Sequence, residues 1–119
     1  MTNIFEKRRQ GGSGRAGRVS EKRTSKLFGG KLTPSSGAIE GMKGDFKVKD
    51  FLFEHKSTKN DSLGLKFDWL AKINREARST NKRPILSVEF TTEGGQPIPN
   101  GQWALVPMAW LKEVIDDLP

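Results

Sequence analysis

The chain has 119 residues, enough for one domain with one modest core. It has no cysteine, which excludes disulfides and cysteine-based zinc sites. It also has no apolar run of the length needed for a membrane span or a signal peptide, so we expect a cytoplasmic protein.

Positive charge is concentrated at the N-terminus. The formal net charge is +7, and residues 1–33 hold nine basic and two acidic side chains, whereas the remaining residues are balanced. Residues 1–18 mix glycine with arginine, which predicts a flexible basic arm before a domain of residues 19–119. Such an arm suits nucleic acid, because cationic side chains neutralise phosphates. A solubilising tail is the alternative.

A short helix is predicted next, from residue 19 or 20 to Phe28, with Ser20 as its cap and two glycines as its stop. Its one acid is Glu21, which by itself would be a solvated side chain. The segment Lys-Leu-Thr-Pro-Ser-Ser-Gly-Ala at 31–38 is then expected to be a loop or an edge segment.

A β-hairpin is predicted over residues 44–56, with Lys49 and Asp50 as a two-residue turn. In that register Asp45 lies opposite Glu54, and strand alternation puts Lys56 on the same face. Two opposed carboxylates repel, and a divalent cation removes the conflict. A lysine beside a bound cation suits phosphodiester cleavage. A surface hairpin with scattered charges is the simpler interpretation.

In this order the residues resemble the PD-(D/E)xK nuclease superfamily, whose motif is an acid at one strand end and Glu-x-Lys on the next strand. The positions here read Asp45, then Glu54-His55-Lys56. The helix acid, the Thr-Pro-Ser-Ser-Gly-Ala segment and the Gly-Asp pair are most similar to the small Holliday junction resolvases of archaea and phages. The resemblance covers residues 19–90.

The chain departs from the resembled pattern at two positions. Gly44 replaces the proline before the aspartate, and His55 stands where an apolar residue is more usual. The His55 side chain should point away from Glu54, so a hydrogen-bonded core histidine is favoured over a general base.

The resemblance implies a restriction-endonuclease-like fold and magnesium-dependent cleavage of DNA, with manganese as an alternative metal. Asp45 and Glu54 would ligate the metal together with the backbone carbonyl of His55. Glu21 would assist directly or through water, and Glu40 is the alternative third acid.

The same resemblance assigns roles to Lys56 and to one of two serines. Lys56 would position the attacking water, and either Ser35 or Ser36 would hold the phosphate. Symmetric cutting of a four-way junction implies a homodimer with two-fold symmetry. Contacts to branched double-stranded DNA are expected from Lys7, Arg8, Arg9, Arg15, Arg18, Lys22, Arg23 and Lys66.

The second half of the chain is expected to supply the core. A helix is predicted over residues 65–78, with Phe67, Leu70, Ile73, Asn74 and Ala77 on its buried side and Lys72, Arg75 and Arg78 solvated. Strands are predicted at 85–90 and 103–106, turns at 93–97 and 99–101, and a last helix at 108–115. Trp103 and Trp110 are expected to pack.

The resulting order is helix, three strands, helix, two strands, helix, an α/β domain with a central mixed sheet flanked by helices. Other functions stay open on the same residues: a repair, nicking or restriction-like nuclease, a non-catalytic nucleic-acid-binding protein, or an inactive subunit of a recombination complex.

Overall fold

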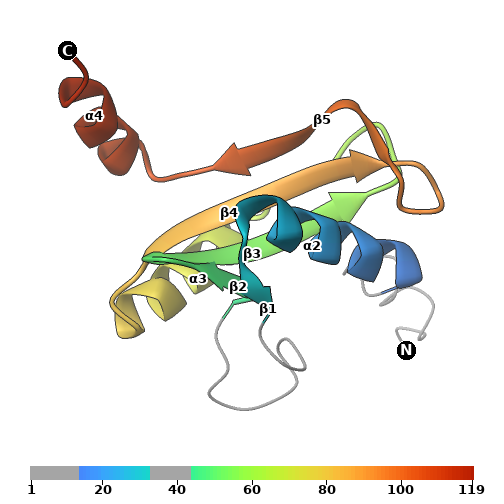
Figure 1. Cartoon of the computed structure of the whole chain (residues 1–119), viewed down its shortest axis with the longest axis horizontal. Helices are drawn as coiled ribbons and strands as arrows, with labels where there is room; N and C mark the ends of the chain where they lie inside the picture. The colour runs from blue at the N-terminus through green and yellow to red at the C-terminus, as the bar shows by residue number, and fades with distance from the viewer. Residues whose placement is uncertain (1–13, 33–43) are drawn as a thin grey trace.

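The structure, a computed structural model, describes residues 14–32 and 44–119, which form one α/β domain with a five-stranded mixed sheet and three helices (Figure 1). In chain order the elements are α2 (Arg15–Phe28), β1 (Lys31–Leu32), β2 (Phe46–Val48), β3 (Phe51–Thr58), α3 (Phe67–Ser79), β4 (Arg83–Thr91), β5 (Pro97–Leu105) and α4 (Met108–Asp116). This is the predicted class and the predicted order of elements. No helix in the described residues has the length and apolar character needed to cross a bilayer.

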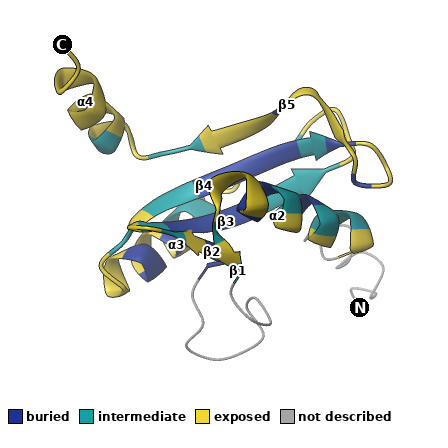
Figure 2. Cartoon of the chain, viewed as in Figure 1, coloured by how far each residue is buried: buried dark blue, intermediate teal, exposed yellow. Residues whose placement is uncertain are grey.

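The sheet has the strand order β1-β2-β3-β4-β5 and is antiparallel except between β3 and β4. Parallel neighbours need a crossover, which α3 supplies. The central strand β3 is covered on both faces: the His55 side chain contacts Ser20 of α2, and Glu54 contacts Lys72 of α3. Figure 2 shows burial concentrated on β3 and β4, between these helices.

The core is small and divided by the sheet. On the α2 side, Phe53 stacks on Phe46 with ring centroids 4.5 Å apart and lies 5.0 Å from the ring of Phe28. On the α3 side, Leu52 packs with Ile73 and Ala77 of the helix. Since Leu52 and Phe53 are neighbours in the chain, strand alternation sends one side chain into each half of the core.

Helix α2 begins earlier than predicted. It starts at Arg15 after Gly14, so Ser20 is a buried residue within the helix and not its cap, and residues 15–18 are helical. The predicted stop is confirmed, because Gly29 caps the helix with a φ of 69°. The early start was hidden because α2 buries the polar side chains of Ser20 and Thr24, so the sequence lacks an apolar stripe.

Strand β5 is also longer than predicted. The segment 99–101, predicted to be a turn, lies within it, opposite an irregularity in β4 between Glu89 and Thr91. Asn100 has a φ of 59°, and a Cβ on Gly101 would lie 2.7 Å from the carbonyl oxygen of Phe90. A distortion that glycine permits therefore bends a continuous strand, and no turn forms.

The buried side of α3 is rotated from the predicted one. Ile73 and Ala77 are buried as expected, but the third buried residue is Glu76, whereas Asn74 is exposed and Phe67 is 77% exposed. The Glu76 carboxylate accepts a hydrogen bond from the main-chain N–H of Gly44, just before β2, which turns this side of the helix inward. One tryptophan expectation is also wrong, because Trp103 is 64% exposed.

Candidate active site

Gly44 fixes the entry of the chain into the predicted hairpin. Its φ is 63°, and a Cβ there would lie 2.8 Å from the Leu52 side chain and 2.9 Å from the Phe53 carbonyl oxygen, so only glycine fits. Its N–H donates to Oε1 of Glu76 at 3.1 Å. A proline has a φ near −65° and no N–H. The departure from the resembled Pro-Asp pattern therefore has a backbone cause.

Asp45 follows Gly44 and is attached to β3. The predicted register is confirmed within the strands, where Val48 pairs with Phe51. Asp45 lies just before β2 and is buried, and its Oδ2 accepts a hydrogen bond of 2.6 Å from the main-chain N–H of His55. Because the N–H and C=O of one strand residue point to the same side, the His55 carbonyl is expected on the Asp45 side of β3.

Glu54 of β3 lies beside a second carboxylate and two lysines. It is buried, and its Oε1 lies 3.7 Å from Nζ of Lys56 and 3.7 Å from Nζ of Lys72. Burial and then the negative charge of Asp45 raise the pKa of Glu54 to about 7, although the two lysines oppose this rise. The carboxylate pair predicted from the hairpin is therefore brought together, and its repulsion is only partly neutralised.

Lys56 lies on the same face of β3 as Glu54, as strand alternation predicts. Its side chain is mostly buried, and its Nζ lies 4.7 Å from the centre of the Trp69 ring. Lys66, just before α3, lies 5.9 Å from the same ring. A cation over an aromatic face is held by the ring quadrupole. Trp69 therefore helps to fix the ammonium group of Lys56 beside Glu54.

Glu21 approaches the site from α2. Burial, followed by the charges of Asp45 and Glu54, raises the pKa of Glu21 to about 7. Glu21 of α2 therefore lies close enough to Asp45 and Glu54 for their charges to act on it. The alternative acid, Glu40, lies outside the described residues.

Sequence reasoning missed two contributors from α3. Lys72 is exposed, as expected, but its Nζ also lies 3.7 Å from Oε1 of Glu54 and 4.0 Å from Oε2 of Glu76, which is itself buried. The signal for Glu76 was present, because an acid beside Ala77 and three residues after Ile73 falls on the apolar side of the helix. Lys72 gave no such signal, since its role depends on how α3 crosses β3.

Comparison of the chain with protein-family models, with curated proteins and with solved structures gave no match. The chemistry of the site must therefore be argued from its own residues.

The acidic residues of the site differ in how well they suit a metal ion. In residues 14–32 and 44–119, no three His, Cys, Asp or Glu side chains form a group that could hold a metal, so Glu21, Asp45 and Glu54 are not a ready three-carboxylate site. Magnesium, however, usually takes only one or two carboxylates from a protein, with water and substrate phosphate as its other ligands. Asp45 and Glu54 fit that requirement, because both offer carboxylate oxygens and because their mutual repulsion is only partly neutralised by the nearby lysines.

The other face of β3 holds a separate polar network. Nε2 of His55 lies 2.7 Å from Oγ of Ser20, and Nδ1 lies 2.7 Å from Oγ of Ser87. Ser20 donates its hydrogen to Glu89, so the His55 proton is assigned to Nε2 and Ser87 donates to Nδ1. Burial lowers the pKa of His55 to about 4, against the raising effect of Asp45 and Glu89. His55 is thus a neutral core residue, as predicted.

The residues predicted to contact DNA divide into four groups, one of which is Lys66 alone, exposed just before α3 and beside Trp69. Arg15, Arg18 and Lys22 are exposed at helical spacing along one side of α2, and Lys26 continues their line. Arg23 is different, because it is paired with Glu89 and donates to the carbonyl of Gly95 at 2.6 Å. Its assignment to DNA contact is therefore corrected to a structural role. Lys7, Arg8, Arg9, Ser35 and Ser36 lie outside the described residues.

Proposed function

We propose that this chain is a metal-dependent DNA endonuclease whose catalytic centre contains Asp45, Glu54 and Lys56. The observation that carries the proposal is the environment of Glu54, a buried carboxylate beside a second carboxylate and within 3.7 Å of two lysine ammonium groups. Strongly perturbed acids next to positioned cations are typical of catalytic sites.

Asp45 and Glu54 would hold magnesium, or manganese, with the His55 carbonyl, and Glu21 would assist directly or through water. The bound metal would supply Lewis-acid stabilisation of charge on the phosphate. Lys56, held over Trp69, would position the attacking water. Water adds to phosphorus as the bond to the 3′ oxygen breaks, leaving a 5′ phosphate and a 3′ hydroxyl. Ser35 or Ser36 would bind a phosphate oxygen.

The DNA substrate that we propose is a Holliday junction, cut symmetrically by a homodimer with the restriction-endonuclease-like fold. This follows the resemblance of residues 19–90 to the small resolvases. The exposed basic line of α2 supports DNA binding, because its side chains can neutralise phosphates. Glu21 on the same helix lies near Asp45 and Glu54, so DNA bound along α2 would lie near these acids. Another repair, nicking or restriction-like nuclease would use the same catalytic residues on a different DNA shape.

One observation favours a second candidate, a non-catalytic DNA-binding protein. The line of Arg15, Arg18, Lys22 and Lys26 can contact phosphates without any help from the acids. Such a protein would bind DNA equally well in magnesium and in EDTA, and Asp45→Asn would not change its function.

The decisive experiment is a cleavage assay on a four-way junction, a matched linear duplex and a single strand, in magnesium or EDTA. Wild type is compared with Lys56→Ala and with the control Lys59→Ala, which removes a lysine from an exposed surface ion pair with Glu93. We expect paired nicks in the junction alone, lost in EDTA and in Lys56→Ala and retained in Lys59→Ala. Cutting of all three DNAs would move the function to a broader nuclease class. Metal-independent binding without cleavage would establish the second candidate.

A further inference from the structure

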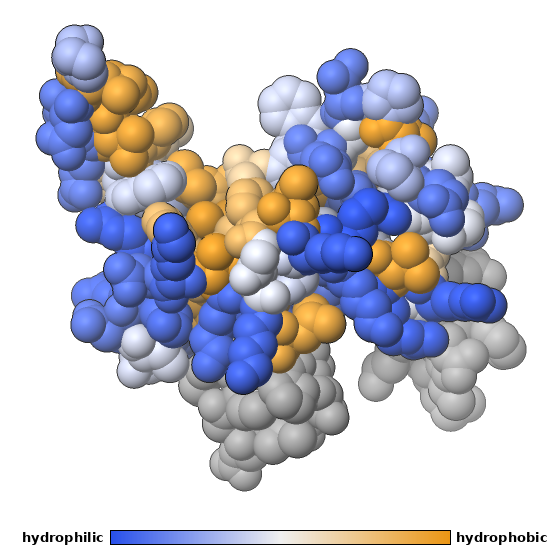
Figure 3. Space-filling view, in the orientation of Figure 1, coloured by the Kyte–Doolittle hydropathy of each residue, from blue (hydrophilic) through white to orange (hydrophobic). Residues whose placement is uncertain are grey.

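Helix α4 carries an unpartnered apolar stripe. Met108, Leu111 and Ile115 recur at helical spacing on α4, Leu118 follows just after the helix, and all four are exposed, Met108 to 88%. Within the described chain, no residue of α4 is buried. Figure 1 shows the helix projecting from the end of β5, away from the sheet, and Figure 3 shows apolar side chains gathered along it.

The projecting position of α4 is held by contacts on its other sides. Trp110 packs edge-on against Phe51 with ring centroids 5.4 Å apart, and Glu113 lies 3.5 Å from Arg83 at the start of β4. These residues hold the helix to the domain while its apolar stripe stays uncovered. Because the helix is held to the domain, its exposed apolar stripe indicates a surface that contacts another molecule and not a loose end of the chain.

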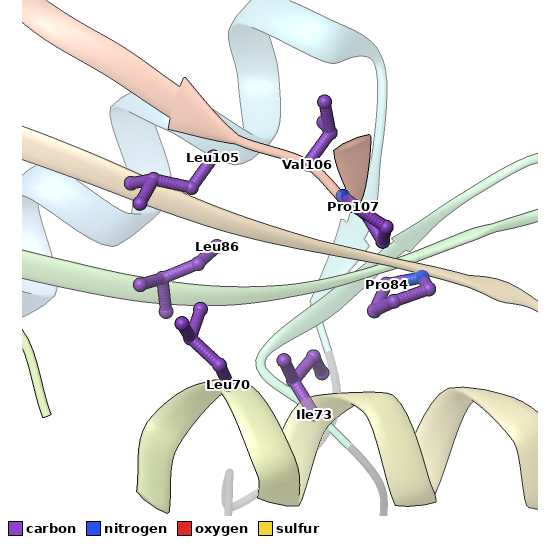
Figure 4. A pocket seen from close by; sticks show the side chains of 7 residues that line it. All are labelled: Leu70, Ile73, Pro84, Leu86, Leu105, Val106 and Pro107. Carbon is purple, nitrogen blue, oxygen red and sulfur yellow. The ribbon is translucent and has the colours of Figure 1, made fainter. Parts of the chain in front are cut away.

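A complementary apolar hollow lies at the root of the same helix. It has a volume of ≈ 240 Å³ and is formed between α3 and the ends of β4 and β5 (Figure 4). All the residues that line it are apolar: Leu70, Ile73, Pro84, Leu86, Leu105, Val106 and Pro107. Typical small-molecule sites measure about 300–1,000 Å³ and contain a few polar groups, so this hollow suits inserted apolar side chains better.

The chain cannot easily fill this hollow with its own helix. Only Val106 and Pro107 separate β5 from α4, and both line the hollow. Pro107 has a ψ of 134°, so the connection is extended and directs the helix outward. Short, stiff connections of this kind favour exchange of an element between two identical chains.

We propose that two copies of this chain form a two-fold symmetric dimer in which the apolar stripe of α4 from each copy lies in the hollow of the other. One contact made twice would cover both apolar surfaces, as an isologous interface requires. Charge agrees, because α4 and the residues after it carry three acids and one lysine, whereas the rest of the chain is strongly basic. Exposed Phe67 and Arg78 lie on the side of α3 that borders Leu70, where they can meet apolar and acidic groups of α4.

This inference does not rest on cleavage of DNA, and its test measures mass. Sedimentation equilibrium of the full chain should give a dimer for wild type and at least about tenfold weaker association for Leu111→Glu. The matched control is Ala109→Glu, which adds the same charge on the polar side of α4 and should leave the dimer intact. Circular dichroism of each variant establishes that it is folded. A monomeric wild type at tens of micromolar, or equal effects of the two substitutions, would overturn the proposal.

Cross-linking tests the exchange itself, because the chain has no cysteine. An oxidised mixture of Leu111→Cys and Phe67→Cys should give a covalent dimer that neither variant gives alone, and Asp61→Cys in place of Phe67→Cys should give none. Efficient cross-linking of Leu111→Cys with itself would show that two α4 helices pack against each other, which contradicts insertion into the hollow.

Discussion

Two buried glutamates on neighbouring strands have opposite environments. Glu89 of β4 accepts hydrogen bonds from Ser20, Arg23 and Gln102. Burial alone would raise the pKa of Glu89, but these donors lower it. Glu54 of β3 is buried beside Asp45, and its pKa is raised to about 7.

The difference separates a polar cluster that stabilises the fold from one that is arranged for chemistry. Around Glu89 and His55, each donor has an acceptor. The Glu89 carboxylate therefore stays charged and the His55 imidazole stays neutral. Around Glu54, two lysines lie at 3.7 Å, outside hydrogen-bonding distance, while other acids oppose its ionisation. Proteins keep such unfavourable groupings chiefly at functional sites.

The largest expected effect on stability comes from replacing Glu89, on the α2 side of the sheet. Glu89→Ala leaves Arg23 and Ser20 without their shared acceptor and should lower the free energy of unfolding by about 3 kcal/mol or more. Denaturant unfolding at pH 7 measures this change. The control Glu93→Ala removes an 88% exposed carboxylate nearby and should change stability by less than about 0.5 kcal/mol. A loss of that small size in Glu89→Ala would mean that the network contributes little.

Local pattern was sufficient to predict the hairpin but not this network. A two-residue turn sets the register, and alternation then places Lys56 with Glu54 and His55 on the opposite face. Glu89 meets Ser20 across 69 residues, and no local periodicity specifies that contact.

The same limit explains the errors on the helices. The start of α2 was missed because its buried side is polar. Lys72 is exposed as predicted, but its ion pair with Glu54 was missed because that contact depends on the crossing of α3 over β3. Alternation and turn chemistry act within one element or one hairpin, whereas these contacts depend on tertiary packing.

Replacing Glu54 is expected to have a smaller effect on stability, and one of the opposite sign. Because its folded-state pKa of about 7 exceeds the usual 4.5, the folded protein binds more protons than the unfolded chain between these pH values, and stability falls as pH rises through this range. Glu54→Gln removes this penalty. In EDTA at pH 8 we expect the variant to be more stable by about 1–3 kcal/mol, with little difference at pH 4.

Metal dependence sharpens this test of Glu54. Magnesium should raise the melting temperature of wild type at pH 8 but not that of Glu54→Gln, because the variant lacks one of the two proposed ligands. Cleavage should also be lost in the variant. If Glu54→Gln instead destabilises the protein in EDTA at pH 8, Glu54 is a structural partner of the lysines, and the contrast with Glu89 fails.

The smallest effect on stability is expected when Lys72 is replaced. Its side chain is 51% exposed, so Lys72→Met should cost less than about 1 kcal/mol of stability. It should nevertheless raise the pKa of Glu54 further, because a nearby positive charge is removed while burial and Asp45 remain. Carboxyl-selective NMR titration measures this shift, with Arg75→Met on an exposed part of α3 as the matched control. An unchanged pKa in Lys72→Met would mean that solvent already screens the ammonium group, leaving Lys56 as the cation that governs Glu54.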